Sequence, residues 1–341
     1  MTTASWAQWL DRIGSGEDLG LEEAAAAFTE IMEGRATPAQ VGALLMGLKT
    51  KGEANSEIAG ALSAMRAAAV SVPIDPSGLV DVVGTGGDGA NTFNISTAAA
   101  FVAAGGGARV AKHGNRSASS SVGTADVLEA LGADIELPPE ETAAIVEEVG
   151  FGFLFARAYH PAMRHVGPVR SEMGVRTLFN ILGPMANPAG VKRYVVGVAD
   201  RSLVDPMLLA LVELGVDYAF VVHGSDGLDE ITVTGPTLIG RYKEERVTHA
   251  EFTPSDFGVE SAELDEIRGG TAEENAATIR SVLGGEKGAR RDVVLVNASA
   301  ALVAAGISEG FVDGVEDARK SIDSGAALDV LERFVEASGD G

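Results

Sequence analysis

A glycine-rich loop between a short apolar segment and an alanine-rich segment constrains the fold of this chain most. Residues 81–88 read DVVGTGGD, and residues 94–97 read NIST ahead of a run of alanines. The apolar residues before the glycines predict a buried strand, and Ser96 or Thr97 is expected to cap a helix over residues 98–104. Because a helix start offers unpaired N–H groups and partial positive charge, this order of elements indicates a phosphate-binding site.

The glycine loop by itself also has a purely structural explanation, because a turn between a strand and a helix often needs glycine only for its geometry. The loop does not match GxxxxGK[ST], and a glycine loop by itself does not separate nucleotides from sugar phosphates. It ends in Asp88, which would repel a bare anion unless a metal ion or a backbone N–H lay beside the carboxylate.

Apolar segments of strand length recur along the chain and alternate with helical segments, as is typical of a parallel sheet covered by helices. We predict strands at residues 79–83, 108–111, 193–198, 218–222 and 293–296. Residues 231–252 follow a period of two and predict antiparallel strands at an edge of the sheet. The predicted fold class is therefore α/β with a mainly parallel central sheet.

The first seventy residues predict helices instead of strands. Apolar residues recur at helical spacing over residues 21–32, and residues 37–40, TPAQ, have the form of a capping box with proline at the first helical position. A third helix is expected from Asn55 or Ser56. The apolar stripes of these helices indicate packing in a core or at a subunit interface rather than a ligand site.

A proline-containing linker at residues 72–78 separates these helices from the strands, and residues 168–182 return to a helical pattern. We therefore predict two domains. The helical domain would comprise residues 1–75, joined in space by residues 166–190. The α/β domain would comprise residues 76–165 and 191–341.

Charge and composition exclude several classes of protein. The 341 residues carry a formal net charge of −23, which argues against binding nucleic acid through a broad basic face. No apolar run is long enough to span a membrane, and the first residues lack the layout of a signal peptide. The sequence has no cysteine, which rules out disulfides, thiolate metal sites and cysteine nucleophiles. These features predict a cytoplasmic protein.

A second polar loop follows the predicted strand at residues 108–111. Lys112 and His113 come directly after this strand, and the loop continues through serines 117 and 119–121. Ligands of open α/β sheets bind at the carboxyl ends of the strands, so Lys112 is expected to face the same crevice as the first loop. His113 is either a polarising donor or a packed histidine, and most of the serines are expected to form turns.

A third polar loop, residues 223–230, ends in the adjacent carboxylates Asp229 and Glu230. Such a pair on a surface is a solvated acidic turn, because exposed charges cost little. Beside a pyrophosphate site the same pair would form a magnesium site, since Mg²⁺ prefers one or two carboxylates together with phosphate and water. The sequence contains no HExxH spacing, which makes zinc chemistry a poor match.

Four long segments in order resemble the anthranilate phosphoribosyltransferase family: GTGGDGANTFNIST, KHGNRSASSSVGTADVLEALG, HPAMRHVGPVRSEMGVRTLFNILGPMANP and GSDGLDEIT. The resemblance extends over nearly the whole chain. It implies a nucleoside phosphorylase/phosphoribosyltransferase-like fold, with a small helical domain and a larger α/β domain, and a homodimer formed through the helical domain. It also implies that the chain joins anthranilate to phosphoribosyl pyrophosphate with magnesium, releasing pyrophosphate, in tryptophan biosynthesis.

The resemblance implies a role for individual residues. Phosphoribosyl pyrophosphate would be bound by Gly84, Thr85, Gly86, Gly87, Asp88, Thr92, Asn94, Ser96, Thr97, Lys112 and Thr124. Anthranilate would contact Gly84, Asn115 and Arg170. Magnesium, expected as two ions, would be held by Ser96, Asp229 and Glu230. Lys112 is expected to act electrostatically, and the resemblance assigns no acid or base.

The chain departs from the family pattern in two places. Thr124 stands where serine is common, which keeps the hydroxyl, and Arg157 stands where proline is common, which leaves open how the acceptor is bound.

Two other functions compete with the transferase. A pyrimidine nucleoside phosphorylase would share the architecture, and a noncatalytic relative would bind nucleic acid through a basic groove that an acidic chain does not predict.

Overall fold

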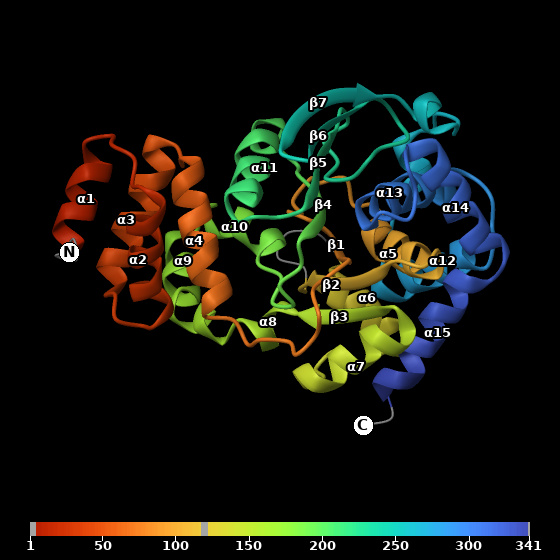
Figure 1. Cartoon of the computed structure of the whole chain (residues 1–341), viewed down its shortest axis with the longest axis horizontal. Helices are drawn as coiled ribbons and strands as arrows, with labels where there is room; N and C mark the ends of the chain where they lie inside the picture. Colours follow the sequence, from red (N-terminus) through yellow and green to blue (C-terminus); the bar gives the residue numbers. More distant parts are fainter. Residues whose placement is uncertain (1–4, 117–121, 340–341) are drawn as a thin grey trace.

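A seven-stranded sheet forms the centre of the computed structural model, which describes residues 5–116 and 122–339 (Figure 1). Its strands are β1 (Leu79–Gly84), β2 (Arg109–Gly114), β3 (Phe151–Phe155), β4 (Arg193–Gly197), β5 (Tyr218–Gly224), β6 (Thr237–Lys243) and β7 (Arg246–Phe252). Their order is β3-β2-β1-β4-β5-β6-β7, in which the first five strands are parallel and the last two pair antiparallel. The predicted mainly parallel sheet with an antiparallel edge is confirmed.

The order of the strands fixes where a ligand can bind. The chain runs outward from β1 to β2 and β3, and it then resumes at β4 on the opposite side of β1. The register of this pair aligns Val82 with Val195 and Gly84 with Gly197. Open α/β sheets bind ligands outside the carboxyl ends of their strands where the connections diverge in this way. The carboxyl ends of β1 and β4 therefore mark the expected site.

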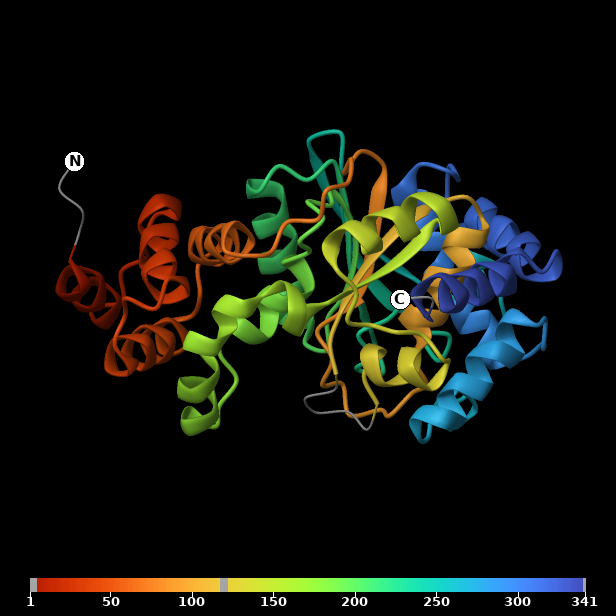
Figure 2. The same cartoon turned by 90° about the horizontal axis from the view of Figure 1, so that it is seen from below.

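Helices cover both faces of the sheet (Figure 2). They are α5 (Ile95–Gly105), α6 (Thr124–Ala130), α7 (Pro139–Val149), α11 (Val204–Glu213), α12 (Ala272–Leu283), α13 (Ala289–Ala305), α14 (Phe311–Asp323) and α15 (Ala326–Gly339). On one face, α5 and α13 both pack against the sheet, and α14 and α15 pack against α5. On the other face, α11 packs against β5 and β6 and also contacts the N-terminal helices.

The N-terminal helices form a separate bundle beside the sheet (Figure 1). Its members are α1 (Trp6–Gly14), α2 (Leu21–Met32), α3 (Pro38–Lys51) and α4 (Asn55–Ala67). The predicted capping box is present, with Thr37 accepting from the Gln40 backbone at the start of α3. Among the described residues, no helix has both the length and the apolar character needed to cross a bilayer.

A chain segment between β3 and β4 lies between this bundle and the sheet. It contains α8 (Ala156–Tyr159), α9 (Gly167–Met173), α10 (Phe179–Leu182) and the 3-10 helices η1 (Pro161–His165) and η2 (Gly183–Met185). Further 3-10 helices are η3 (Arg201–Leu203), η4 (Pro254–Phe257) and η5 (Leu264–Ile267). Helix α9 packs against α3, and Lys49 Nζ donates to the Arg176 carbonyl oxygen at 2.7 Å.

Several predicted elements differ from those observed. The strand predicted at residues 293–296 is wrong, because these residues lie within α13, which is buried on all sides, and a short apolar run does not distinguish a strand from a buried helix. Strand β3 was not predicted. The helix predicted over residues 168–182 is broken after α9, where Gly174 has a left-handed backbone with φ of 61°. Serines 117 and 119–121 lie outside the described residues.

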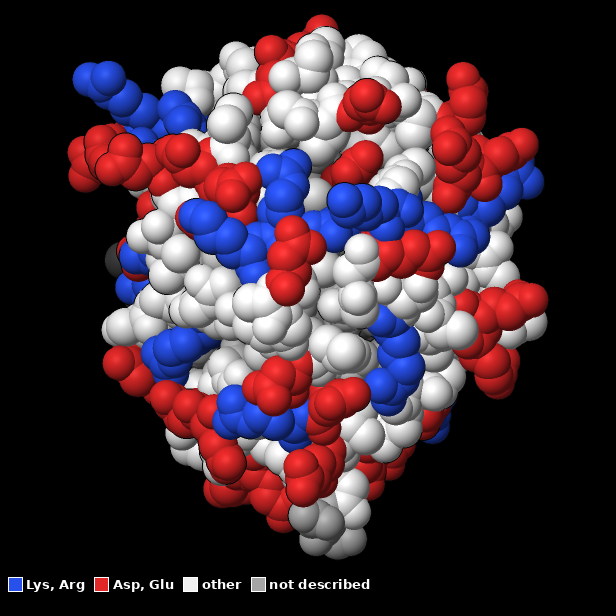
Figure 3. All heavy atoms as spheres, turned by 90° about the vertical axis from the view of Figure 1, so that its right-hand side faces the viewer, with Lys and Arg blue, Asp and Glu red and all other residues white. Residues whose placement is uncertain are grey.

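Side chains of opposite charge are mixed over the surface seen from the side of α14 and α15 (Figure 3). A band of Lys and Arg crosses this face, and Asp and Glu border it above and below.

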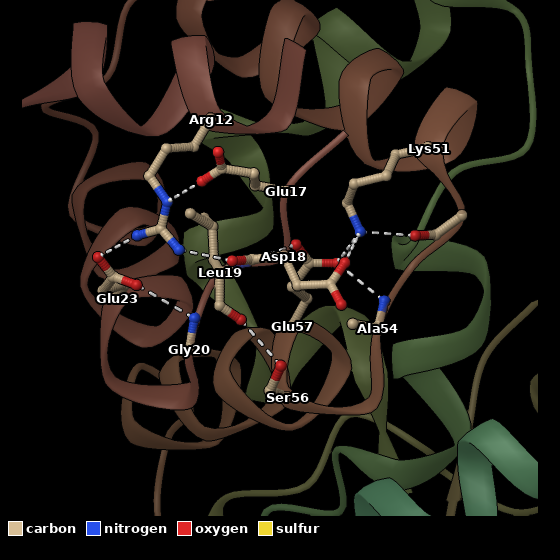
Figure 4. Close-up of polar contacts among 11 residues, drawn as sticks. Arg12, Glu17, Asp18, Leu19, Gly20, Glu23, Lys51, Ala54, Ser56 and Glu57 are labelled. Atoms are coloured by element: carbon tan, nitrogen blue, oxygen red, sulfur yellow. Dashed lines mark hydrogen bonds and ion pairs between the residues drawn. The ribbon is translucent and has the colours of Figure 1, made fainter. Parts of the chain in front are cut away.

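A buried carboxylate holds the bundle together (Figure 4). Glu57 is fully buried and accepts hydrogen bonds from the backbone N–H of Leu19 at 2.9 Å and of Ala54 at 2.8 Å. Lys51 Nζ lies 2.9 Å from the same carboxylate and bridges it to Asp18. A single side chain thus pairs two loop N–H groups and one ammonium that is only 7% exposed.

We predict that Glu57→Ala lowers the free energy of unfolding of the bundle by about 3 kcal/mol, because it leaves two N–H groups unpaired and removes one of the two carboxylates that pair with a buried ammonium. The matched control is Glu30→Ala, which removes a surface pair with Arg35 and should cost at most about 1 kcal/mol. Urea unfolding followed by tryptophan fluorescence reports on this bundle, since both tryptophans, Trp6 and Trp9, lie on α1. Equal losses in the two variants would contradict the prediction.

Candidate functional site

A cavity of about 830 Å³ opens at the carboxyl ends of the parallel strands. Three polar loops that follow β1, β2 and β5 line it, together with the segment from α8 to η2. The residues predicted for the site that line the cavity are Gly84, Thr85, Gly86, Gly87, Asp88, Thr92, Asn94, Ser96, Lys112, Asn115, Thr124, Arg170, Asp229 and Glu230. Residues from distant parts of the sequence therefore meet in one space.

Helix α5 begins earlier than predicted. It starts at Ile95 with Asn94 as its N-cap, so neither Ser96 nor Thr97 caps it. Thr97 is fully buried and does not line the cavity, and its hydroxyl has no hydrogen-bond partner in the part of the chain that the structure describes. The Ser96 N–H donates to Glu230 Oε1 at 3.1 Å. The sequence predicts that the N–H groups at the start of this helix bind phosphate. One of them instead donates to a carboxylate from another loop.

Glycines of the first loop let the third loop approach closely. Gly86 and Gly87 have positive φ angles of 66° and 79°, which favour glycine. The Gly86 N–H donates to Asp229 Oδ2 at 2.7 Å. A Cβ atom at Gly84 would collide with the Asp229 carboxylate, and one at Gly197 would collide with the Asp229 backbone. The close approach of Asp229 therefore requires glycine at positions 84 and 197, and the turn favours glycine at positions 86 and 87.

Lys112 lies inside β2 rather than after it, and its side chain is only 1% exposed. Its Nζ donates to the Val82 carbonyl oxygen and, at 3.2 Å, to Ser96 Oγ. Burial lowers the pKa of this ammonium, while the nearby carboxylates of Asp81, Glu230 and Asp229 act in the opposite direction. The only ammonium among the described lining residues thus stands among three acidic groups, within reach of the start of α5.

The acidic groups carry more negative charge than the neighbouring side chains offset. Burial raises the pKa of Glu230 well above its usual value, and the charge of Asp229 adds to this effect. Burial and the charge of Asp88 raise the pKa of Asp229 to about 6. Raised carboxyl pKa values mark a place where a cation would be favourable.

The donor atoms fit magnesium. Asp229 and Glu230 offer hard carboxylate oxygens and Ser96 a hydroxyl, whereas the described residues contain no group of three or more His, Cys, Asp or Glu side chains arranged as a complete metal site. Mg²⁺ typically takes one or two carboxylates and completes its shell with phosphate oxygens and water. These residues therefore suit a cation that arrives with a phosphorylated ligand.

Arg170 gives another part of the cavity lining a positive charge, in contrast to the acidic groups. Its guanidinium lies 5.6 Å from the centre of the Phe179 ring, and its Nη2 donates to Asn180 Oδ1 at 3.4 Å. Burial lowers its pKa, and no acidic side chain is among the causes of the shift. A partly buried guanidinium beside an aromatic ring suits a planar carboxylate, which can accept two parallel hydrogen bonds. The lining residues Phe179 and Asn180 were not predicted individually.

Two buried histidines line this wall. His113 Nδ1 lies 3.1 Å from the Gly183 carbonyl oxygen, which can only accept, so this nitrogen carries the proton. Burial lowers the pKa of His113 to about 3 and that of His160 to about 4, so both rings are neutral at physiological pH. The Nε2 atom of each ring is buried without a partner among the described residues. The sequence left the role of His113 open and did not identify His160.

A buried aspartate supports the second loop from below. Asp81 accepts from the His113 backbone N–H at 3.1 Å and from Asn187 Nδ2 at 2.8 Å. Asn187 also donates to the Ala111 carbonyl oxygen. Burial raises the pKa of Asp81 to about 7, against the favourable charge of Lys112. Asp81 was not among the predicted site residues. The sequence feature that could have identified it is a charged residue within an otherwise apolar predicted strand.

The helical bundle and the α/β sheet, with a glycine loop at the switch point of the sheet, correspond to the two domains of a glycosyl transferase family. The family model described as "Glycosyl transferase family, a/b domain" matches residues 77–328, and the one described as "Glycosyl transferase family, helical bundle domain" matches residues 7–69.

Comparison with individual proteins narrows this class. The chain is 51% identical over 330 residues to anthranilate phosphoribosyltransferase of Aquifex aeolicus, covering 96% of this chain and 97% of that protein. Its fold matches the crystal structure of anthranilate phosphoribosyltransferase from Thermus thermophilus with a TM-score of 0.92 and 46% identity, over 96% of this chain and 98% of the other. The chain belongs to the anthranilate phosphoribosyltransferase family.

A more distant structure shows a ligand-bound member of the same family. The anthranilate phosphoribosyltransferase from Saccharomyces cerevisiae in complex with PRPP and Mg is 28% identical and has a TM-score of 0.88, with 98% of each chain covered. The activity that defines the family, and with it this chain, is transfer of the phosphoribosyl group to anthranilate in tryptophan biosynthesis.

We predict that Asp229→Asn lowers turnover by about 100-fold or more without lowering stability in the absence of metal. The pKa of this carboxyl is raised to about 6 in the folded chain, so the charged form opposes folding above about pH 6, and this penalty disappears as the pH falls toward 4. Without Mg²⁺, the variant should therefore melt at or above the wild-type temperature at pH 8, and the difference should shrink at about pH 4.5.

The control is Asp217→Asn, the same change at an exposed position before β5. It should alter neither turnover nor melting. A variant at Asp229 that melts well below the wild type at pH 8 would show that this carboxylate serves mainly to hold the fold.

Proposed function

We propose that the cavity binds phosphoribosyl pyrophosphate on its sheet side and anthranilate on the side of α9 and α10. The product would be N-(5-phosphoribosyl)anthranilate, with release of pyrophosphate. One observation carries this arrangement: the acidic, magnesium-type cluster around Asp229 and the partly buried guanidinium of Arg170 line the same cavity. The first suits a metal-bound diphosphate, and the second suits an aromatic carboxylate.

Phosphoribosyl pyrophosphate would lie against the loop after β1 and the start of α5. The residues we assign to it are Gly84, Thr85, Gly86, Gly87, Asp88, Thr92, Asn94, Ser96, Lys112 and Thr124. Thr97 belongs to the same proposal only as support beneath the helix start, since it is fully buried. The relative from Saccharomyces cerevisiae that was solved with PRPP and Mg supports this choice of ligand.

Magnesium would be held by Ser96, Asp229 and Glu230, and we propose two ions. When bound, the metal supplies charge that offsets the negative oxygens of the departing pyrophosphate. Asp88 lies close enough to raise the pKa of Asp229, so it adds to the negative charge that a cation would offset. Its Oδ1 atom accepts from the Ala90 N–H at 3.1 Å, which fixes the end of the glycine loop.

Anthranilate would contact Gly84, Asn115 and Arg170. Arg170 would bind the carboxylate while the Phe179 ring supports its guanidinium, which orients the amine toward the ribose. A structure of the yeast relative in complex with 4-fluoroanthranilate supports an aromatic acceptor. Holding the amine in a near-attack geometry lowers the activation barrier for the transfer. In favourable cases such positioning contributes on the order of 7 kcal/mol or more.

The chemistry requires charge stabilisation and placement rather than a nucleophilic side chain. As the bond from ribose C1 to pyrophosphate breaks, positive charge develops on the sugar and negative charge on the leaving oxygens. Lys112 stabilises the leaving group from beneath, next to Ser96. The neutral rings of His113 and His160 line the acceptor wall without adding charge to it.

We further propose that residues 166–190 belong functionally to the helical domain of residues 1–75, with residues 76–165 and 191–341 forming the α/β domain. The contacts of α9 with α3 support this division. We propose a homodimer formed through the helical domain, where Met46 on α3 is 45% exposed. The proposed compartment is the cytoplasm, as expected of an enzyme of amino-acid biosynthesis.

The direct test mixes the purified protein with phosphoribosyl pyrophosphate, Mg²⁺ and anthranilate and follows the decay of anthranilate fluorescence. We expect decay that depends on all three additions and stops when EDTA removes the metal, because the uncompensated carboxylates then oppose a bare diphosphate. Phosphate-dependent cleavage of a pyrimidine nucleoside without anthranilate turnover would favour the phosphorylase instead.

A further inference from the structure

A buried asparagine outside the cavity holds a residue that lines it. Asn275 lies near the start of α12, which packs against α5, and its side chain is only 1% exposed (Figure 1). Its Nδ2 atom donates to Asn94 Oδ1 at 3.0 Å, although the two residues are 181 positions apart. Asn94 lines the cavity at the start of α5, where we place phosphoribosyl pyrophosphate. A distant side chain is thus joined directly to the proposed binding site.

Asn94 is not used as an asparagine N-cap normally is. Such a side chain usually accepts from an N–H of the first helical turn. Among the described residues, however, no N–H of α5 donates to the Asn94 side chain. The Ser96 N–H donates to Glu230 Oε1 instead. The orientation of the Asn94 amide therefore depends on groups outside its own helix.

Two groups with fixed hydrogen-bonding roles set the orientation of both amides. The Gly270 N–H can only donate, and its nitrogen lies 2.8 Å from Asn275 Oδ1, so the oxygen of this amide faces it. The nitrogen of Asn275 then faces Asn94, which must present its own oxygen. At the other end, the Val122 carbonyl oxygen can only accept, and Asn94 Nδ2 donates to it at 3.3 Å. Both ends of this chain of hydrogen bonds therefore require the same orientation of Asn94.

This orientation leaves a hydrogen-bond donor for a ligand. An amide nitrogen carries two N–H groups, and the Val122 carbonyl oxygen accepts from one of them. No acceptor within residues 5–116 and 122–339 meets the second N–H of Asn94, which lines the cavity. An N–H donor suits the oxygens of a phosphate or a ribose, which accept. The donor would be lost if the amide turned over and presented its oxygen.

The backbone beside Asn94 is held by the segment that precedes α12. Thr92 and Arg268 form an isolated antiparallel bridge. A Cβ atom at Gly269 would lie 2.7 Å from the Thr92 carbonyl oxygen and 2.8 Å from Asn275 Oδ1, which leaves room for glycine alone. Because this segment packs so closely against the loop, Asn275 reaches Asn94 from a fixed support.

We propose that Asn275 is a positioning residue for phosphoribosyl pyrophosphate, which fixes the Asn94 amide so that its N–H donor, and not its oxygen, faces an oxygen of this ligand. The inference rests on the proposed function, because it takes phosphoribosyl pyrophosphate as the ligand. An amide oxygen turned toward the ligand would repel its phosphate or ribose oxygens instead of binding them. Asn275 itself touches neither substrate and acts only through Asn94.

The first test measures the dissociation constant of phosphoribosyl pyrophosphate with Mg²⁺, by calorimetric titration without anthranilate, together with steady-state kinetics. We expect Asn275→Ala to weaken this binding about tenfold, because the Asn94 amide is then able to turn. The KM for phosphoribosyl pyrophosphate should rise by a similar factor. The KM for anthranilate and kcat, measured with the other substrate saturating, should change by about twofold or less.

Asn275→Asp separates an orienting role from a supporting one. A carboxylate at this position still accepts from the Gly270 N–H, but it also accepts from the Asn94 nitrogen, which would turn toward it. The Asn94 oxygen would then face the cavity. We expect this variant to bind phosphoribosyl pyrophosphate more weakly than Asn275→Ala, by a further factor of about three or more. If Asn275 only supported the fold, aspartate of the same shape would be the milder change.

A double-mutant cycle tests whether Asn275 acts through Asn94. In an Asn94→Ala background, neither Asn275→Ala nor Asn275→Asp should weaken binding further, and this result also excludes a direct effect of the new negative charge. Thr271→Ala is the matched control, because it removes the N-cap of α12 and leaves both asparagines in place. It should lower the melting temperature and leave the dissociation constant unchanged.

Four results would overturn the assignment: unchanged binding in Asn275→Ala, wild-type binding in Asn275→Asp, losses that add in the double variants, or an equal loss of affinity in Thr271→Ala. If Asn275→Ala does not fold, Asn275→Asp and its double variant carry the same test. All of these results presuppose a wild type that binds phosphoribosyl pyrophosphate with Mg²⁺. A wild type that does not bind it would refute the proposed function itself, so the two failures are distinguishable.

Discussion

Concentrated negative charge at one edge of the sheet is the constraint on which the rest of the site depends. Asp229 and Glu230 are pressed against the glycine loop and the start of α5, and burial and repulsion raise the pKa values of both. The single ammonium of Lys112 lies among these groups and does not neutralise them all. Such an arrangement is costly in an empty cavity, and it becomes favourable when a divalent cation enters with a diphosphate.

The topology of the sheet creates this arrangement. Since β1 lies between β2 and β4, and β5 follows β4, the loops after β1, β2 and β5 open at one edge although they are distant in sequence. The bundle and the segment from α8 to α10 close the other side of the cavity with arginine, aromatic and histidine side chains. One wall therefore suits a metal-bound leaving group and the other a neutral amine with a carboxylate.

Much of this architecture could be predicted from the sequence, because it depends on local patterns. The strands β1, β2, β4 and β5, the capping box of α3 and the convergence of three loops followed from apolar segments and polar loop residues. The failures have physical causes. Residues 293–296 form part of a helix buried on all sides, where apolar periodicity is lost. The Ser96 N–H is taken by Glu230, 134 residues away, and no local pattern reports such a contact.

The most direct measurement of the central claim is an anomalous difference map from crystals grown with phosphoribosyl pyrophosphate and Mn²⁺ in place of Mg²⁺. Our account predicts at least one manganese peak within coordination distance, about 2.2 Å, of a carboxylate oxygen of Asp229 or Glu230, with the diphosphate against the Gly84–Asp88 loop. A diphosphate bound in the cavity with no metal peak near either carboxylate would contradict it.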